Sequence, residues 1–170
     1  MIFLSLGSNL SSSFGNRFDN INFAISFIQE NKIHVINQSS YYETNSFPDS
    51  SKPKYINIII KVSTTLTPSK FASVLLSIEE KLERKRFKKN DPRTCDIDII
   101  DFDRKNITFK CENLNFVVPH KNLQFRNFVL FPLKEISPKW KHPISDESID
   151  NLIENLSNED KNSILKIKKS

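Results

Sequence analysis

The chain has 170 residues, a length that fits one domain with a single hydrophobic core. Hydrophobic residues make up 38% and charged residues 26% of the chain, which excludes a disordered protein, and no apolar run approaches the roughly 20 residues of a membrane span. Gly7 and Gly15 are the only glycines, so the glycine-rich loops that cradle phosphates in many nucleotide-binding proteins are excluded. Any nucleotide must be held in another way.

The net charge is +5, and lysine is much commoner than arginine. This excess fits a site for a polyanion, but it fits equally a compositional bias spread over the surface. Cys95 and Cys111 suggest neither a disulfide framework nor a zinc site, and the N-terminus lacks the pattern of a signal peptide. We therefore expect a cytoplasmic protein with no membrane partner.

The first half of the chain predicts a strand, a helix and two further strands. Residues 1–6 are an apolar run stopped by a turn signal, and residues 17–29 repeat apolar side chains at helical spacing. Residues 34–43 and 55–65 are β-branched and aromatic, so each is expected to form a strand. The connection over residues 45–54 is longer than a hairpin loop and is typical of a binding element.

The second half begins with a helix, because Thr67 can cap it and Pro68 suits its first position. A basic segment over residues 84–89 ends this helix in a polar loop. The elements expected after the loop are a strand over residues 94–102, a hairpin over 103–110, a helix over 128–136 and a last helix over 145–156.

The order strand, helix, strand, strand, helix, strand is typical of an α+β protein. It predicts a ferredoxin-like antiparallel sheet (βαββαβ) with helices packed on it and a C-terminal helical extension. Because no linker divides the chain, we expect residues 1–160 to form one domain and residues 161–170 to be a frayed tail.

The strongest local motif is an acidic pair in the predicted strand after Pro92. Because strand side chains alternate, Asp96 and Asp98 should lie on one face, about 6.6 Å apart along the strand. Two carboxylates this close repel each other unless a cation lies between them, and hard oxygen ligands of this kind suit Mg²⁺. An edge strand with two solvated acids explains the pattern equally well.

Several cations lie near this pair in the sequence. Arg84 and Arg93 precede it, and Arg126 follows the Pro119-His120 pair. Guanidinium groups bind phosphate oxygens in a bidentate way, so arginines beside a metal-binding acid pair suggest a triphosphate site. The alternatives are a solvated basic loop or a patch for RNA.

Tyr55 and Asn57 should share one face of a strand, which places an aromatic ring beside an amide. This pair suits a flat heterocycle, although two such residues on a solvated face are the commoner case. His120 is by itself more often structural than catalytic.

Taken together, these motifs resemble the 6-hydroxymethyl-7,8-dihydropterin pyrophosphokinase family of folate synthesis. They follow the order of the family over about residues 1–140. The matching segments are Leu4-Ser5-Leu6-Gly7-Ser8-Asn9-Leu10, Ser40-Tyr41-Tyr42-Glu43-Thr44, Tyr55-Ile56-Asn57, Ile78-Glu79 with Arg84, Pro92-Arg93-Thr94-Cys95-Asp96-Ile97-Asp98-Ile99, Val118-Pro119-His120, Arg126, Phe128-Val129-Leu130 and Pro132-Leu133-Lys134-Glu135-Ile136.

The resemblance implies transfer of a pyrophosphoryl group from ATP, the co-substrate, to the hydroxymethyl oxygen of the pterin, which gives AMP and the pterin diphosphate. It implies that Asp96 and Asp98 bridge two Mg²⁺ ions. The implied catalytic residues are Arg84, Arg93, Asp96 and Asp98. The implied ATP site consists of Glu79, Arg84, Lys88, Arg93, Ile99, His120 and Arg126. The implied pterin site consists of Gly7, Thr44, Phe47, Tyr55, Asn57 and Phe128, with Tyr55 and Phe128 on either side of the ring.

The chain departs from the family in two loops. Glu83 stands where family members usually have glycine, and residues 45–49 replace the usual Pro-x-Gly segment. The basic loop is also about one residue shorter, with Asn90 in place of a frequent tryptophan. We expect intact chemistry with altered loop closure, because the acids, arginines and pterin residues are present.

Two alternatives from other functional classes are an RNA- or DNA-binding module on a ferredoxin-like sheet and a catalytically decayed family member. Asp96 and Asp98 argue against the first, because they would repel a phosphate backbone. The complete set of polar site residues argues against the second. We expect a monomer with no nucleic-acid partner.

Overall fold

The computed structural model describes residues 1–46, 49–85 and 91–168. The elements, in chain order, are β1 (Ile2–Ser8), α1 (Arg17–Glu30), β2 (His34–Gln38), β3 (Tyr41–Thr44), β4 (Tyr55–Ser63), α2 (Pro68–Lys81), β5 (Asp96–Phe102), β6 (Ile107–Cys111), β7 (Leu114–Val118), the 3-10 helix η1 (Leu123–Phe125), α3 (Asn127–Ile136), α4 (Ile149–Glu154), α5 (Asn158–Asn162) and β8 (Ile164–Ile167). Across these described ranges, no helix has the length and apolar character needed to cross a membrane.

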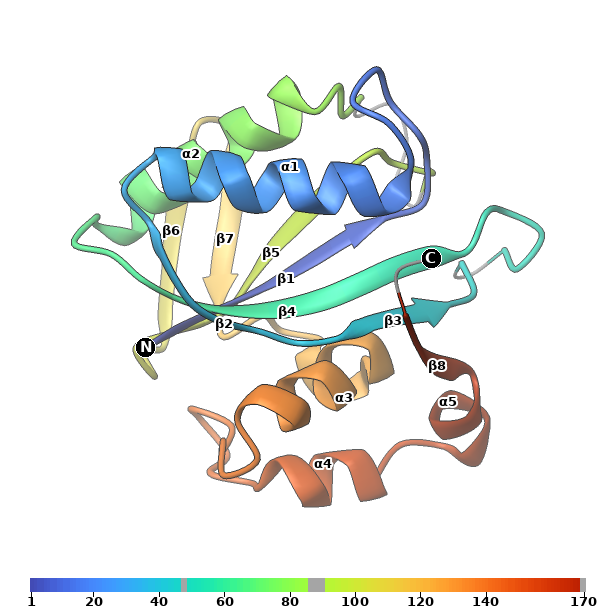
Figure 1. The fold of residues 1–170 in the computed structure, drawn as a ribbon. Coiled ribbons are helices and arrows are strands. Elements are labelled where there is room, and N and C mark those ends of the chain that lie inside the picture. The colour runs from blue at the N-terminus through green and yellow to red at the C-terminus, as the bar shows by residue number, and fades with distance from the viewer. Residues whose placement is uncertain (47–48, 86–90, 169–170) are drawn as a thin grey trace.

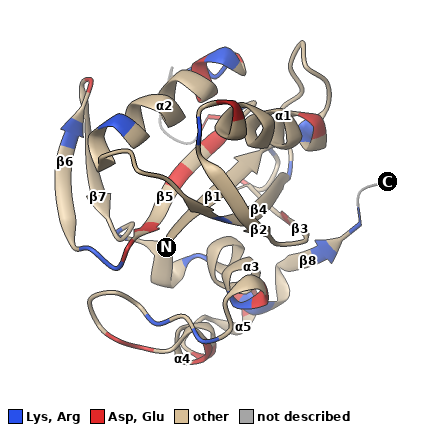
Figure 2. Cartoon of the chain, turned by 60° about the vertical axis from the view of Figure 1, so that its left-hand side comes forward, with Lys and Arg blue, Asp and Glu red and all other residues tan. Residues whose placement is uncertain are grey.

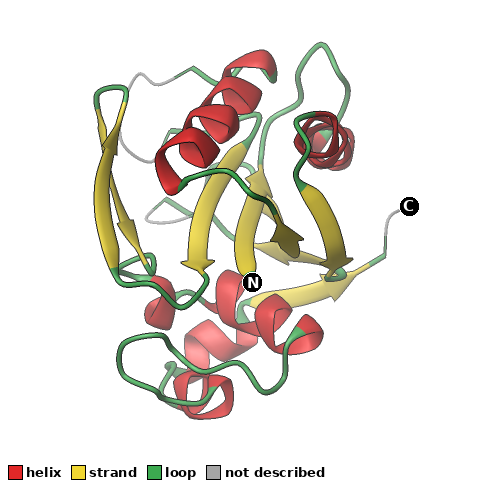
Figure 3. Cartoon of the chain, turned by 90° about the vertical axis from the view of Figure 1, so that its left-hand side faces the viewer, coloured by secondary structure: helices red, strands yellow, loops and turns green. Residues whose placement is uncertain are grey.

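A six-stranded antiparallel sheet forms the centre of the molecule, in the order β5-β1-β4-β3-β8, with β2 also paired to β4. Strands β6 and β7 form a separate hairpin, which stands beside the sheet in Figure 3. The protein is therefore an α+β protein with an antiparallel sheet and packed helices, and the prediction is confirmed at this level.

Helices cover both faces of the sheet (Figure 1). On one face, α1 and α2 bury a core with the side chains of Leu4 and Leu6 from β1. On the other face, α3 and α4 bury a second core around Phe3, Ile59 and Ile100. Strand side chains alternate between faces, so neighbouring residues of one strand belong to different cores.

The sheet face under α3 and α4, called the second face below, is apolar over only part of its length. Toward one end of the sheet it carries Phe3, Ile59 and Ile100 under α3 and α4. Toward the other end, the same alternation brings Ser5 of β1 and Asn57 of β4 to this face. The sheet therefore has a polar region that the helices leave open.

The predicted helix starting at Thr67 is confirmed, since Thr67 accepts a hydrogen bond from Lys70 N and Pro68 is the first helical residue. The single strand predicted over residues 34–43 is wrong, because β2 ends at Gln38 and β3 begins at Tyr41. At this break, Ser39 N donates to Ile59 O at 2.9 Å, while Ser39 Oγ accepts from Ile59 N at 3.0 Å.

The C-terminal part differs most from prediction. The helix expected over residues 145–156 starts only at Ile149, where Ser148 caps it. The frayed tail expected over residues 161–170 is wrong for residues 164–167, which form β8 and pair with β3. A four-residue strand carries little signal of its own and depends on the edge to which it pairs.

The Glu135 carboxylate of α3 joins three elements, and its bonds predict acid sensitivity. It accepts hydrogen bonds from Ser40 Oγ at 2.8 Å, Tyr42 OH at 2.8 Å and Lys166 Nζ at 3.1 Å. Partial burial raises the pKa of Glu135, but these bonds outweigh it, so the pKa lies below the ordinary value of 4.5. Ionised Glu135 therefore stabilises the fold above that pH, and this contribution is lost as the pH falls through the lowered pKa.

We expect the unfolding midpoint in urea to fall more steeply below about pH 4.5 for the wild type than for Glu135→Gln. Glu30→Gln, which changes an exposed residue at the end of α1, should follow the wild type. Parallel curves for the wild type and Glu135→Gln would contradict the assigned role of the carboxylate.

Candidate active site

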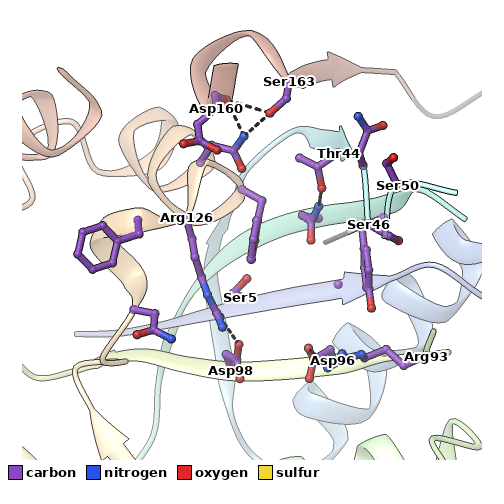
Figure 4. A pocket seen from close by; sticks show the side chains of 18 of the residues that line it. Ser5, Thr44, Ser46, Ser50, Arg93, Asp96, Asp98, Arg126, Asp160 and Ser163 are labelled. Atoms are coloured by element: carbon purple, nitrogen blue, oxygen red, sulfur yellow. Dashed lines mark hydrogen bonds and ion pairs between the residues drawn. The ribbon is translucent and has the colours of Figure 1, made fainter. Parts of the chain in front are cut away.

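A cavity of about 860 Å³ occupies the polar region of the second face (Figure 4). Its floor comes from β1, β4 and β5, and its walls come from the end of β3, the loop after it, residues 122–128 and residues 159–163. The lining residues that were predicted as site residues are Gly7, Thr44, Tyr55, Asn57, Arg93, Asp96, Asp98, Arg126 and Phe128.

The acid pair lies on the floor of this cavity, on one face of β5 as predicted. Asp96 forms ion pairs with Arg84 Nη1 at 2.6 Å and Arg93 Nη1 at 2.8 Å, and Arg126 Nη1 lies 2.9 Å from Asp98 Oδ2. The side chains of Asp96 and Asp98 are only 25% and 33% exposed. β5 is an edge strand, yet its acids are paired with arginines and are not simply solvated. Figure 2 shows the acidic positions of β5 in red.

Arg84 is the most deeply buried of these cations, with a side chain only 9% exposed. It pairs with Glu79 as well as with Asp96. Burial lowers the pKa of Arg84, but the neighbouring Asp96 and Glu79 carboxylates outweigh it, so the pKa is raised and the group stays charged.

Glu79 lies beneath the cavity at the end of α2 and is 3% exposed. Its Oε1 accepts the backbone N–H of Ile97 at 2.7 Å and pairs with Arg84. Glu79 therefore ties α2 to β5 and holds Arg84 beside Asp96. Glu79 does not line the cavity, so any effect of its side chain on a ligand would pass through Arg84.

The other end of the cavity combines an aromatic ring with an amide. Asn57 Nδ2 donates to Thr44 Oγ1 at 3.0 Å, and both residues are buried. Burial raises the pKa of Tyr55, so its hydroxyl stays protonated at neutral pH. A Cβ at Gly7 would lie 3.1 Å from Asn57 Oδ1 and 3.6 Å from the Tyr55 ring. Glycine at this position keeps the floor open between the amide and the acid pair.

Four predicted site residues remain to be placed, and they are Ile99, His120, Phe47 and Lys88. The side chain of Ile99 is buried in the core with α1 and α2, so only its backbone could contact a ligand. The backbone N–H of His120 donates to Ile100 O at 3.1 Å, and burial lowers the pKa of the His120 imidazole. Phe47 and Lys88 lie outside the described residues.

Asn9 was missed as a site residue, although it belongs to the Gly7-Ser8-Asn9 turn. Its Oδ1 accepts from Arg93 N at 2.7 Å, and its Nδ2 donates to Pro53 O at 3.0 Å. Asn9 therefore fixes the backbone of Arg93 and the loop between β3 and β4. The polar residues of 159–163 were also missed, because they belong to no motif.

Glu83, which replaces the usual family glycine, adopts a left-handed backbone with φ of 63°. Its carboxylate accepts hydrogen bonds from Ser13 N at 3.1 Å and Ser13 Oγ at 2.5 Å, and these bonds lower the pKa of Glu83. The predicted change in loop closure involves residues 86–90, which lie outside the described residues.

The family model of 7,8-dihydro-6-hydroxymethylpterin-pyrophosphokinase (HPPK) matches residues 3–138. The chain belongs to this family. HPPK membership confirms the resemblance inferred from the ordered motifs, which extend over nearly the same residues.

Relatives of this chain are named for the same pyrophosphokinase or for folic acid synthesis. A 2-amino-4-hydroxy-6-hydroxymethyldihydropteridine pyrophosphokinase of Synechocystis is 38% identical over 72% of this chain and 60% of its own length. The Bacillus subtilis protein of the same name is 33% identical over 79% of this chain and 76% of its own length. The folic acid synthesis protein fol1 of Pneumocystis carinii is 33% identical over 94% of this chain, which spans 20% of that protein.

The wild-type HPPK-DHPS of Plasmodium falciparum has a similar fold, with a TM-score of 0.67 at 17% sequence identity. The match covers 89% of this chain and 43% of that one. It shows that the chain has the HPPK fold.

The buried position of Glu79 predicts a large effect on stability. Glu79→Ala leaves the buried Arg84 guanidinium and the Ile97 N–H with one partner fewer. We expect it to lower the free energy of unfolding by about 3–5 kcal/mol in denaturant titration. Glu79→Gln keeps an acceptor for Ile97 and should cost less. Glu80→Ala, at the next and exposed position, is the matched control, and an equal effect at Glu80 would refute the prediction.

Proposed function

We propose that this chain transfers the pyrophosphoryl group of ATP to the hydroxymethyl oxygen of 6-hydroxymethyl-7,8-dihydropterin, giving AMP and the pterin diphosphate in folate synthesis. One observation carries the proposal: an acid pair bounded by arginines and an aromatic-amide pocket share a single cavity. Membership of the HPPK family supports the same reaction.

The pterin would occupy the end of the cavity formed by Tyr55, Asn57, Thr44 and Phe128. The ring is flat, and aromatic side chains on either side would stack on its faces. One N–H of the Asn57 amide is donated to Thr44 Oγ1, so the amide offers its other N–H and its carbonyl oxygen to the mixed donors and acceptors on the edge of a pterin. Gly7 lets the hydroxymethyl arm pass over the floor toward Asp96.

The donor set suits Mg²⁺. Among the described residues, no group of three or more His, Cys, Asp and Glu side chains could form an all-protein metal cage. Asp96 and Asp98 supply two partly exposed hard oxygen ligands, and Mg²⁺ usually completes such a site with water and phosphate oxygens. We propose two ions. When bound, Mg²⁺ neutralises phosphate charge and makes the substrate hydroxyl easier to deprotonate.

The arginines would supply positioning and charge. Arg84, Arg93 and Arg126 are already held at the acid pair, and guanidinium groups match the geometry of phosphate oxygens. Attack at the β-phosphorus needs no side-chain nucleophile, since in-line positioning and electrostatic stabilisation supply most of the rate. His120, Ile99 and Lys88 remain predicted ATP contacts.

We also propose that β1 to β5, with α1 and α2, form a ferredoxin-like unit to which the later elements are a C-terminal extension. The strand order β5-β1-β4-β3 supports this assignment. A monomeric, cytoplasmic enzyme remains our expectation. The RNA- or DNA-binding alternative is not favoured, because the family match and the paired acids point to a kinase site.

The proposed reaction is tested by incubating the chain with ATP, Mg²⁺ and the hydroxymethyl pterin and measuring AMP. We expect AMP only when both substrates are present, and none after chelation of Mg²⁺. Asp98→Ala should lower turnover by about a hundredfold or more, because it removes a metal ligand.

Asp150→Ala is the matched control, because Asp150 lies on α4 and pairs with Lys134 at the surface. It should leave turnover unchanged. Full activity of Asp98→Ala would remove the metal assignment, and a wild type that releases no AMP would overturn the proposed function.

A further inference from the structure

The C-terminal segment returns to the cavity although it lies beyond the region that the family model matches, residues 3–138. Glu159, Asp160 and Ser163 line the cavity. Asp160 and Ser163 lie on the side opposite the acid pair (Figure 4). We call residues 157–167, which include α5 and β8, the clasp. Its contacts reach both walls of the proposed pterin pocket.

The first wall is the end of β3 together with β4. β8 pairs with β3 in antiparallel register, with Ile164 opposite Thr44 and Lys166 opposite Tyr42. On its other side, β3 pairs with β4, where Thr44 is opposite Tyr55. β8 therefore braces the outer edge of the strand that carries Thr44, and Thr44 in turn accepts the hydrogen bond of Asn57.

The second wall is the start of α3. Asn127 is 8% exposed and lies between Arg126 and Phe128. Its Nδ2 donates to Asp160 O at 2.6 Å and to Ser163 Oγ at 3.0 Å. Both N–H groups of this amide are therefore used by the clasp, and they fix the segment from which the neighbouring arginine and phenylalanine extend.

A third contact lies at the other end of α3. Lys166 of β8 donates to Glu135, which also binds Ser40 and Tyr42. The clasp thus joins α3 to β3 at two points, one at the cavity and one behind it. The two walls cannot separate there without breaking these contacts.

We propose that the clasp sets the separation of the two pocket walls, and that Asn127 and Ser163 are positioning residues for the pterin. The inference rests on the proposed function, because the ligand between the walls is taken to be the pterin. A flat ring binds well only when both faces are in contact, so a small change in wall spacing should weaken ring binding. ATP should be affected less than the pterin, because Arg84, Arg93 and the acid pair lie away from the segment that Asn127 fixes and only Arg126 is next to it.

The test uses full-length Ser163→Ala, Ser163→Thr and Asn127→Ala, with Asn162→Ala, an exposed residue next to Ser163 at the end of α5, as the control. The dissociation constant of 6-hydroxymethylpterin is measured by its fluorescence in the presence of Mg²⁺ and a non-hydrolysable ATP analogue. The dissociation constant of the analogue is measured by calorimetry. Amide hydrogen exchange over residues 41–44 reports on the wall itself.

We expect Ser163→Ala to weaken pterin binding about threefold to tenfold, the effect of one hydrogen bond, and Asn127→Ala to weaken it about tenfold or more. Exchange over residues 41–44 should become faster in both variants. Ser163→Thr, which keeps the hydroxyl, should restore binding. Binding of the ATP analogue should change less than about twofold in Ser163→Ala, and in Asn127→Ala it should change several-fold less than pterin binding, because Arg126 is the one arginine next to Asn127. Asn162→Ala should match the wild type.

Unchanged pterin affinity in Ser163→Ala and Asn127→Ala would overturn the inference while leaving the proposed function intact, even if exchange became faster, because the clasp would then only support the sheet. Equal losses for pterin and the ATP analogue would also overturn it, since they indicate general destabilisation. A wild type that binds the ATP analogue but not the pterin would overturn the proposed function, and the inference with it.

Discussion

The antiparallel register around Gly7 fixes the geometry of the whole site. Gly7 of β1 lies opposite Asn57 of β4 on one side and opposite Asp96 of β5 on the other. Directly opposed residues point to the same face of a sheet, and adjacent strands are about 4.8 Å apart, so the amide and the first acid lie about 10 Å apart across a residue with no side chain. A shift of one residue in either pairing would turn one of these groups into the core. The proposed meeting of pterin and phosphate thus depends on the pairing of three central strands.

The site also depends on the pairing of its buried charges. A buried Arg84 guanidinium without partners would destabilise the fold, and Glu79 and Asp96 supply those partners. Glu79 is held in turn by the Ile97 N–H, so the last turn of α2, the loop arginine and β5 form one unit. The triphosphate would enter a cavity whose arginines are already in place, and it would compete with the acids for them. This preorganisation reduces the cost of ordering long side chains during binding.

Strand alternation and helix capping depend only on residues close in the sequence, so they could be predicted from it. Alternation predicted that Asp96 and Asp98 share a face, and the cap at Thr67 predicted the start of α2; both are confirmed. The pairing partner of each strand has no local signal, so neither the break between β2 and β3 nor β8 could be predicted. The proximity of Arg84 and Arg93 to the acid pair in the sequence suggested a triphosphate site but left a solvated basic loop open, because their convergence on Asp96 depends on how the basic loop leaves α2.

Glu83 has a side chain at a backbone position whose conformation favours glycine. A left-handed conformation costs a residue with a side chain about 1–2 kcal/mol, which explains why glycine is usual there. Here φ is 63°, so the chain path suited to glycine is retained. Two hydrogen bonds from Ser13 to the Glu83 carboxylate offset part of this cost.

The two hydrogen bonds from Ser13 also join the start of the basic segment to the loop between β1 and α1. The same loop also binds Arg93, whose backbone carbonyl accepts hydrogen bonds from the backbone N–H groups of Asn9 and Leu10 at 3.1 and 3.2 Å. At the start of this segment, side-chain hydrogen bonds therefore hold a left-handed backbone position that glycine adopts without strain.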